Sequence, residues 1–89
     1  MNETYKPASH VAWRRIDEEI VVLNLSNSDY YSLNGVGARM WELLSEGHPA
    51  EKVAALVAQE YGAPPKEVCA DVDEFLGKLN QERLLEPAL

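Results

Sequence analysis

The sequence is poor in the residues that build covalent or metal-bound sites. It has one cysteine and two histidines among 89 residues. A single cysteine cannot form a disulfide within the chain, which is typical of a protein of the reducing cytoplasm. Cys69, His10 and His48 lack the spacing of zinc ligands, and no Cys–His motif activates the thiol. We therefore expect no metal, no cofactor and no catalysis, and we expect Cys69 to be a small buried residue.

Long apolar runs and basic residues are also scarce. No segment reaches the roughly 20 apolar residues of a membrane span, and the first ten residues lack the apolar region of a signal peptide. Eight Lys and Arg residues face fifteen Asp and Glu residues, for a net charge of −7. The basic pair Arg14–Arg15 is followed by three acids at 17–19. Because an acidic chain repels phosphate groups, we expect neither nucleic acid nor a membrane as a partner.

What the chain does have is the composition of one small globular domain. Its hydrophobic fraction is 46%, which is ordinary for a folded protein. Residues 1–9 are polar and contain Pro7, and they predict a flexible tail. Residues 10–89 are then a single domain, with room for one modest core and no deep catalytic cleft.

Three short strands are predicted in the N-terminal half, over residues 10–15, 19–25 and 29–33. The second of them, EIVVLNL, is the clearest because it is rich in β-branched residues and bounded by turn signals. Its alternation places Ile20, Val22 and Asn24 on one face and Val21, Leu23 and Leu25 on the other. The turn Ser26-Asn27-Ser28 makes the second and third strands a hairpin.

Three helices are predicted to follow, over residues 35–45, from Pro49 to Tyr61, and from Pro65 to about Glu82. Asn34 is a favourable N-cap, and Gly47 and Gly62 end the first two helices. Gly37 predicts close packing of the first helix against the sheet. Leu84 and Leu85 are expected to fold back onto the core.

Three N-terminal antiparallel strands followed by three helices predict an α+β fold. Two short helices and a longer third one beside a small sheet also describe a winged helix-turn-helix shape.

The third helix carries an unusually wide apolar stripe, made of Val68, Cys69, Val72, Phe75, Leu76 and Leu79. Each of these residues alone is most simply a core residue. Together they form a stripe wider than the helix face that the core needs. The excess apolar surface predicts a groove beside the third strand. One of Tyr30 and Tyr31 must face away from the core. An extended peptide could add to this strand and place alternate side chains in the groove.

Several short motifs, in this order, resemble the family of pyrroloquinoline quinone biosynthesis protein D (PqqD) and the wider group of RiPP recognition elements. The motifs are YSLN at 31–34, MWELL at 40–44, Gly47, Asp71-Val72, Phe75-Leu76, Leu79 and Leu84-Leu85. The resemblance covers about residues 10–86. Each motif is short and mostly apolar, so the order and spacing carry the resemblance.

The resemblance implies a non-catalytic domain that binds the leader of a ribosomally made precursor peptide as an added strand. Such a domain presents the peptide to a separate modifying enzyme, for example a radical S-adenosylmethionine protein or a leader peptidase. The peptide-facing residues carried over by position are Tyr30, Tyr31, Ser32, Leu33, Val68, Asp71, Val72, Phe75 and Leu76.

The rival interpretation is a winged-helix DNA-binding transcriptional regulator, because fold does not fix function. A recognition helix needs Lys and Arg for phosphate contacts. The third helix offers only Lys66 and Lys78 against five acidic residues, which favours the peptide-binding interpretation. An exposed third strand could also pair with a second copy and give a homodimer.

Overall fold

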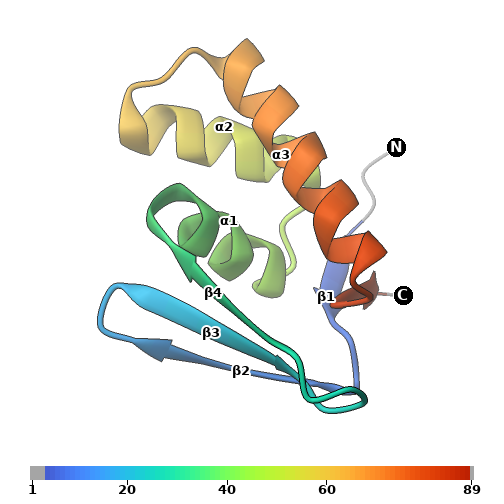
Figure 1. Cartoon of the computed structure of the whole chain (residues 1–89). Coiled ribbons are helices and arrows are strands. Elements are labelled where there is room, and N and C mark those ends of the chain that lie inside the picture. Colours follow the sequence, from blue (N-terminus) through green and yellow to red (C-terminus); the bar gives the residue numbers. More distant parts are fainter. Residues whose placement is uncertain (1–3, 89) are drawn as a thin grey trace.

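The computed structural model describes residues 4–88 and arranges them in an α+β fold, as predicted (Figure 1). The elements are, in order, β1 (Tyr5–Pro7), β2 (Val11–Ile16), β3 (Glu19–Asn24), β4 (Tyr30–Asn34), α1 (Gly35–Ser45), α2 (Ala50–Tyr61), α3 (Pro65–Gln81) and β5 (Leu85–Pro87). Strands β2, β3 and β4 form one antiparallel sheet in that order. Figure 1 shows the three helices on one side of this sheet.

The chain termini differ from the prediction. Residues 1–9 are predicted as a tail, but residues 5–7 form β1, which pairs antiparallel with β5 in a second sheet. The Ala8 N–H donates to Leu84 O at 3.0 Å, and the Ala88 N–H donates to Thr4 O at 3.0 Å. The tail prediction is therefore wrong for residues 4–8, and the part of it that concerns residues 1–3 lies outside the described residues. The described chain also has five strands in two sheets, where three strands were expected.

The core lies between the inner face of the three-stranded sheet and the helices. On β3, the face made of Ile20, Val22 and Asn24 is the buried one. Alternation groups these residues on one face but does not say which face is inward. The helices contribute further fully buried side chains, chief among them Trp41, Leu43, Leu44, Val53, Val57 and Val72. Leu84 and Leu85 are buried as well, as expected.

The helices begin and end close to the predicted residues. The contacts expected of Asn34 and Gly37 differ from the prediction. Helix α1 spans residues 35–45, although the side chain of Asn34 makes no capping hydrogen bond. A Cβ on Gly37 would lie 3.9 Å from the ring of Phe75, so this glycine faces α3 rather than the sheet. Gly62 ends α2 in the left-handed conformation, with φ of 63°.

Cys69 is exposed on α3, so the prediction that it is buried is wrong. Cys69 lies at the margin of the apolar stripe. There, a rotation of the helix by a few tens of degrees determines whether a side chain faces the core or the solvent. Within residues 4–88, none of the helices is both long and apolar enough to cross a membrane.

Candidate functional site

Strand β4 is an edge strand, and within the described residues its sheet partner is β3 alone. The Asn24 N–H donates to Asp29 O at 2.8 Å, just before β4 begins. Hydrogen-bonded and non-hydrogen-bonded pairs alternate along an antiparallel ladder, so the backbone groups of Tyr31 and Leu33 point toward β3. The N–H and C=O groups of Tyr30 and Ser32 therefore point outward from the sheet edge.

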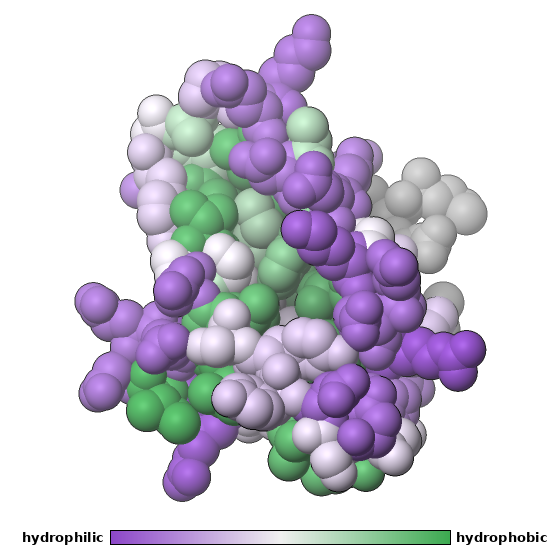
Figure 2. Space-filling view, in the orientation of Figure 1, coloured by the Kyte–Doolittle hydropathy of each residue, from purple (hydrophilic) through white to green (hydrophobic). Residues whose placement is uncertain are grey.

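A groove of about 390 Å³ lies beside this edge, between β4 and the C-terminal half of α3. We call it the β4–α3 groove. Its lining consists of Val22, Tyr31, Leu33, Phe75, Lys78, Leu79, Gln81, Glu82 and Leu84. Figure 2 shows hydrophilic side chains along the exposed side of α3, next to a paler and greener surface between this helix and β4. The groove thus combines an apolar floor with a polar rim on the helix.

Three of the nine residues predicted to face a peptide line this groove. They are Tyr31 and Leu33 on β4 and Phe75 on α3. Tyr30 and Ser32 lie on the opposite face of the sheet, and the Tyr30 side chain is 71% exposed. These two residues can contribute to the edge through their backbone groups.

The other predicted residues lie outside the groove lining. Val68, Val72 and Leu76 are buried in the core at 4%, 1% and 9% exposure, and Asp71 is exposed. Charged and amide residues at the C-terminal end of α3 and just beyond it line the groove in their place: Lys78, Gln81 and Glu82. The helical spacing from Phe75 to 78, 79 and 82 could have identified this face, but the sequence does not show which part of α3 lies beside β4.

Tyr31 and Glu82 bridge the groove. The Tyr31 hydroxyl donates a 2.7 Å hydrogen bond to Glu82 Oε1. The hydrogen bond to Glu82 and the negative charge of the Glu82 carboxylate raise the pKa of Tyr31 to about 12, since both disfavour the phenolate. The bond joins the edge strand to the residue that follows α3, so it fixes the spacing of the two groove walls at this end.

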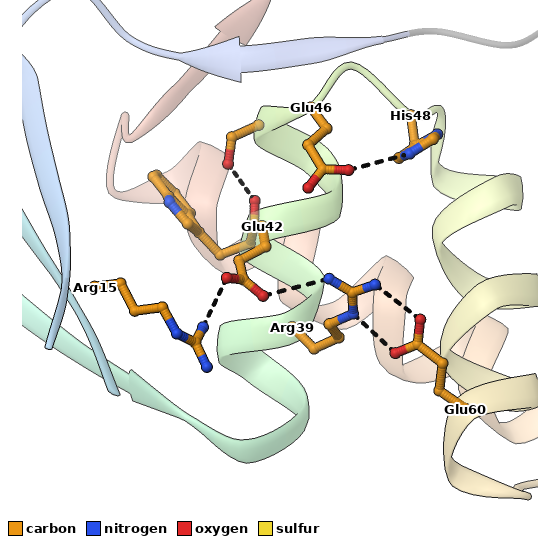
Figure 3. A network of polar contacts seen from close by, with 8 residues as sticks. Arg15, Arg39, Glu42, Glu46, His48 and Glu60 are labelled. Atoms are coloured by element: carbon orange, nitrogen blue, oxygen red, sulfur yellow. Dashed lines mark hydrogen bonds and ion pairs between the residues drawn. The ribbon is translucent and has the colours of Figure 1, made fainter. Parts of the chain in front are cut away.

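A polar network holds the opposite end of the sheet to the helices (Figure 3). Glu42 of α1 accepts from Arg15 of β2 at 2.7 Å and from Arg39 at 3.4 Å. Arg39 in turn forms a bidentate pair with Glu60 of α2, with both distances 2.8 Å. A second cavity, of about 420 Å³, lies beside this network. Its arginines are already paired with carboxylates, so the network is best explained as structural.

The residues present also bear on metal chemistry. Over residues 4–88, no group of three or more His, Cys, Asp and Glu side chains is placed to hold a metal ion.

The model of the family described as Coenzyme PQQ synthesis protein D (PqqD) matches residues 19–85. No curated protein sequence matches the chain.

Three solved structures share the fold. TbiB1, solved in complex with the TbiA(beta) leader peptide, is 36% identical, with a TM-score of 0.87 over 91% of this chain and 94% of that one. A lasso peptide synthetase B1 complexed with its leader peptide is 20% identical, with a TM-score of 0.85 over 93% and 98% of the two chains. The PqqD part of Methylobacterium extorquens PqqCD, a RiPP recognition element, is 23% identical, with a TM-score of 0.73 over 92% and 87%.

The last two likenesses concern the fold alone. The first combines more than a third identity with nearly complete coverage of both chains, and the family model covers most of this chain from β3 to β5. The chain therefore belongs to the PqqD family.

Proposed function

We propose that this chain is a non-catalytic peptide chaperone. It binds the leader of a ribosomally synthesised precursor peptide by β-strand addition and presents it to a separate modifying enzyme. The observation that carries the proposal is the outward-facing edge of β4 directly beside the β4–α3 groove. The TbiB1 structure, which contains a leader peptide, supports the same role for a relative of this chain.

The geometry suits strand addition. The N–H and C=O groups of Tyr30 and Ser32 offer the main-chain hydrogen bonds that an added strand needs. Alternate side chains of that strand would fall on the face of Tyr31 and Leu33, where Phe75 completes an apolar floor. Main-chain bonds supply affinity in this arrangement, and the groove supplies specificity.

The rival function, a winged-helix DNA-binding regulator, has less support. The side of α3 that faces solvent carries Glu67, Asp71, Asp73 and Glu74 against Lys66 and Lys78. Phosphate binding requires an excess of cationic side chains. The excess of carboxylates on α3 favours a peptide over a nucleic acid.

The proposal extends to the partners of the domain. The modifying enzyme would be a radical S-adenosylmethionine protein or a leader peptidase, acting in the cytoplasm, and the domain would raise the local concentration of precursor at that enzyme. Strand β4 would be occupied by the leader in the working complex. Any homodimer through that edge would compete with the leader, so we expect a monomeric peptide-bound form.

The test is a titration of the ¹⁵N-labelled chain with the leader of the precursor encoded beside it. We expect the largest amide shifts in β4 and along residues 75–82. Ser32→Pro removes an N–H that points outward and is not used by the sheet, so it should lower leader affinity at least tenfold while the fold is retained. Ser32→Ala is the matched control and should bind normally. A folded chain whose spectrum is unchanged by the leader would refute the proposal.

A further inference from the structure

The three-stranded sheet has a second face that no helix covers. Trp13 lies on the inner face, where its ring meets that of Trp41 with the centroids 6.0 Å apart. Arg15, two residues on, also points inward and bonds to Glu42 of α1. Alternation therefore directs Ala12 and Arg14 to the opposite face. In Figure 1 this face is turned away from all three helices.

This uncovered face is mostly apolar. The registers align Ala12 with Leu23 and Tyr30 in one row across the strands, and Arg14 with Val21 and Ser32 in the next. We call these six residues the outer sheet face. Leu23 and Val21 are half-buried by their neighbours, and Tyr30 is 71% exposed. Four of these six side chains are apolar or aromatic, and the registers make them contiguous across the three strands.

The charges on and around this face indicate which charges a complementary partner surface would carry. Arg14 lies within it and forms no ion pair with any residue from 4 to 88. The turn at its edge carries Asp17 and Glu18, followed by Glu19 on β3. A complementary surface would be apolar at its centre, with one acidic group opposite Arg14 and basic groups opposite the turn.

A second copy of this chain fits that description poorly. Each copy carries a net charge of −7, so the acidic turns of two copies would add to a general repulsion. Three strands about 4.8 Å apart and five residues long give a projected face of only about 230 Å². A stable dimer buries about 800 Å² on each side. The outer sheet face alone is therefore too small for a stable homodimer.

An added strand would enlarge this face. Residues that pair across an antiparallel ladder share a face of the sheet. The peptide residues bonded to the backbones of Tyr30 and Ser32 would therefore point outward with those two side chains, while the residues between them point into the groove. The bound peptide would form a fourth row of side chains on the outer sheet face.

We propose that the outer sheet face, together with the outward side chains of the bound peptide, is the surface on which the peptide-modifying enzyme docks. This inference rests on the proposed function. The enzyme recognises a surface that is complete only when the leader is in place, so it distinguishes the loaded domain from the empty one. Its docking surface is apolar, with an acidic residue for Arg14 and a basic rim for the turn at 17–19.

The test separates leader binding from enzyme docking. Leu23→Lys and Arg14→Glu change the outer sheet face without touching the groove, so leader affinity should stay within twofold of wild type. In an assay with the precursor and the modifying enzyme encoded beside this chain, both variants should lower the modification rate at limiting enzyme at least tenfold. Arg14→Glu is at an exposed position and keeps the test valid if Leu23→Lys does not fold. Tyr61→Lys, a half-exposed aromatic residue on α2, is the matched control and should modify normally.

Three other outcomes would overturn the proposal. Normal modification rates in both outer-face variants, with leader binding intact, would refute docking at this face and leave the proposed function standing. A wild-type chain that does not bind the leader would remove the proposed function and this inference together. A wild-type dimer in sedimentation that Leu23→Lys converts to monomer would assign the face to a second copy instead.

Discussion

The hydroxyl of Tyr31 on β4 and the carboxylate of Glu82 just beyond α3 meet at 2.7 Å across the β4–α3 groove. Tyr31 belongs to the groove floor, and Glu82 belongs to its rim. One hydrogen bond therefore couples the edge strand to the helix end. The same bond makes Tyr31 the residue whose titration reports on the state of the groove.

The first prediction concerns alkaline pH. The pKa of Tyr31 is raised from 10.0 to about 12 in the folded chain. The folded state therefore holds the phenol proton more tightly than the unfolded state. Its stabilising effect is complete below pH 10 and is lost as the pH rises toward 12. Urea unfolding between pH 9 and pH 12 should show stability falling more steeply for wild type than for Tyr31→Phe.

Tyr30→Phe is the matched control for this measurement. It removes a hydroxyl from the adjacent residue, whose side chain lies on the other face of the sheet. This variant should retain the steep alkaline loss of stability. An equally steep loss in Tyr31→Phe would contradict the assignment of that loss to the Tyr31–Glu82 bond.

The second prediction separates residues of the groove from residues of the core on one helix. Phe75 is half-buried and lines the groove, whereas Val72 is 1% exposed and lies in the core. Phe75→Ala should lower leader affinity at least tenfold in calorimetry while the chain still folds, although the lost packing of the ring against the core also lowers the urea midpoint. Val72→Ala should instead lower the free energy of unfolding by about 2 kcal/mol, because it leaves a core cavity. The reverse pattern would show that the groove is misassigned.

Local signals explain what could be predicted from the sequence. The end of α1 follows from Gly47, which has a positive φ of 96°, and the division of β3 into two faces follows from strict alternation through Ile20 and Val22. The edge position of β4 follows from its place as the last strand before the helices. These features depend on neighbouring residues, and so a sequence pattern records them.

The features that could not be predicted depend on contacts between distant segments. Val72 and Leu76 share the stripe of Phe75, but only the placement of α3 on the sheet puts them in the core and leaves Phe75 in the groove. The pairing of β1 with β5 joins segments about 80 residues apart. Neither fact leaves a periodic signal, since both depend on how already formed elements pack.

The third prediction concerns this pairing of the termini. Deleting residues 1–8 removes β1 and the Ala8–Leu84 hydrogen bond. It also uncovers Leu85, which is 7% exposed. The free energy of unfolding should fall by about 2–3 kcal/mol from lost burial and hydrogen bonds. Lys6→Ala, an exposed change on the same strand, should have no such effect. If the deletion left the urea midpoint unchanged, residues 4–8 would be a tail as the composition suggested.

The fourth prediction concerns the ion pair between Arg39 and Glu60. The bidentate bond to Arg39 lowers the pKa of Glu60 below its ordinary value of 4.5. The stabilisation is therefore present above about pH 4.5 and is lost as the pH falls through the lower folded-state value. The side chains are 33% and 37% exposed, so solvent screening limits the effect to about 0.5 kcal/mol. Glu60→Gln should destabilise the chain by that amount at pH 7 and have no effect at pH 2.

A double-mutant cycle isolates the contribution of this pair, because Arg39 also contacts Glu42. The cycle compares wild type, Arg39→Gln, Glu60→Gln and the double variant by urea unfolding at pH 7. The coupling energy should be about 0.5 kcal/mol in low salt and should shrink in 1 M salt, where charges are screened within about 3 Å. Coupling that is unchanged in 1 M salt would mean that the pair acts through the geometry of its two 2.8 Å hydrogen bonds rather than through charge.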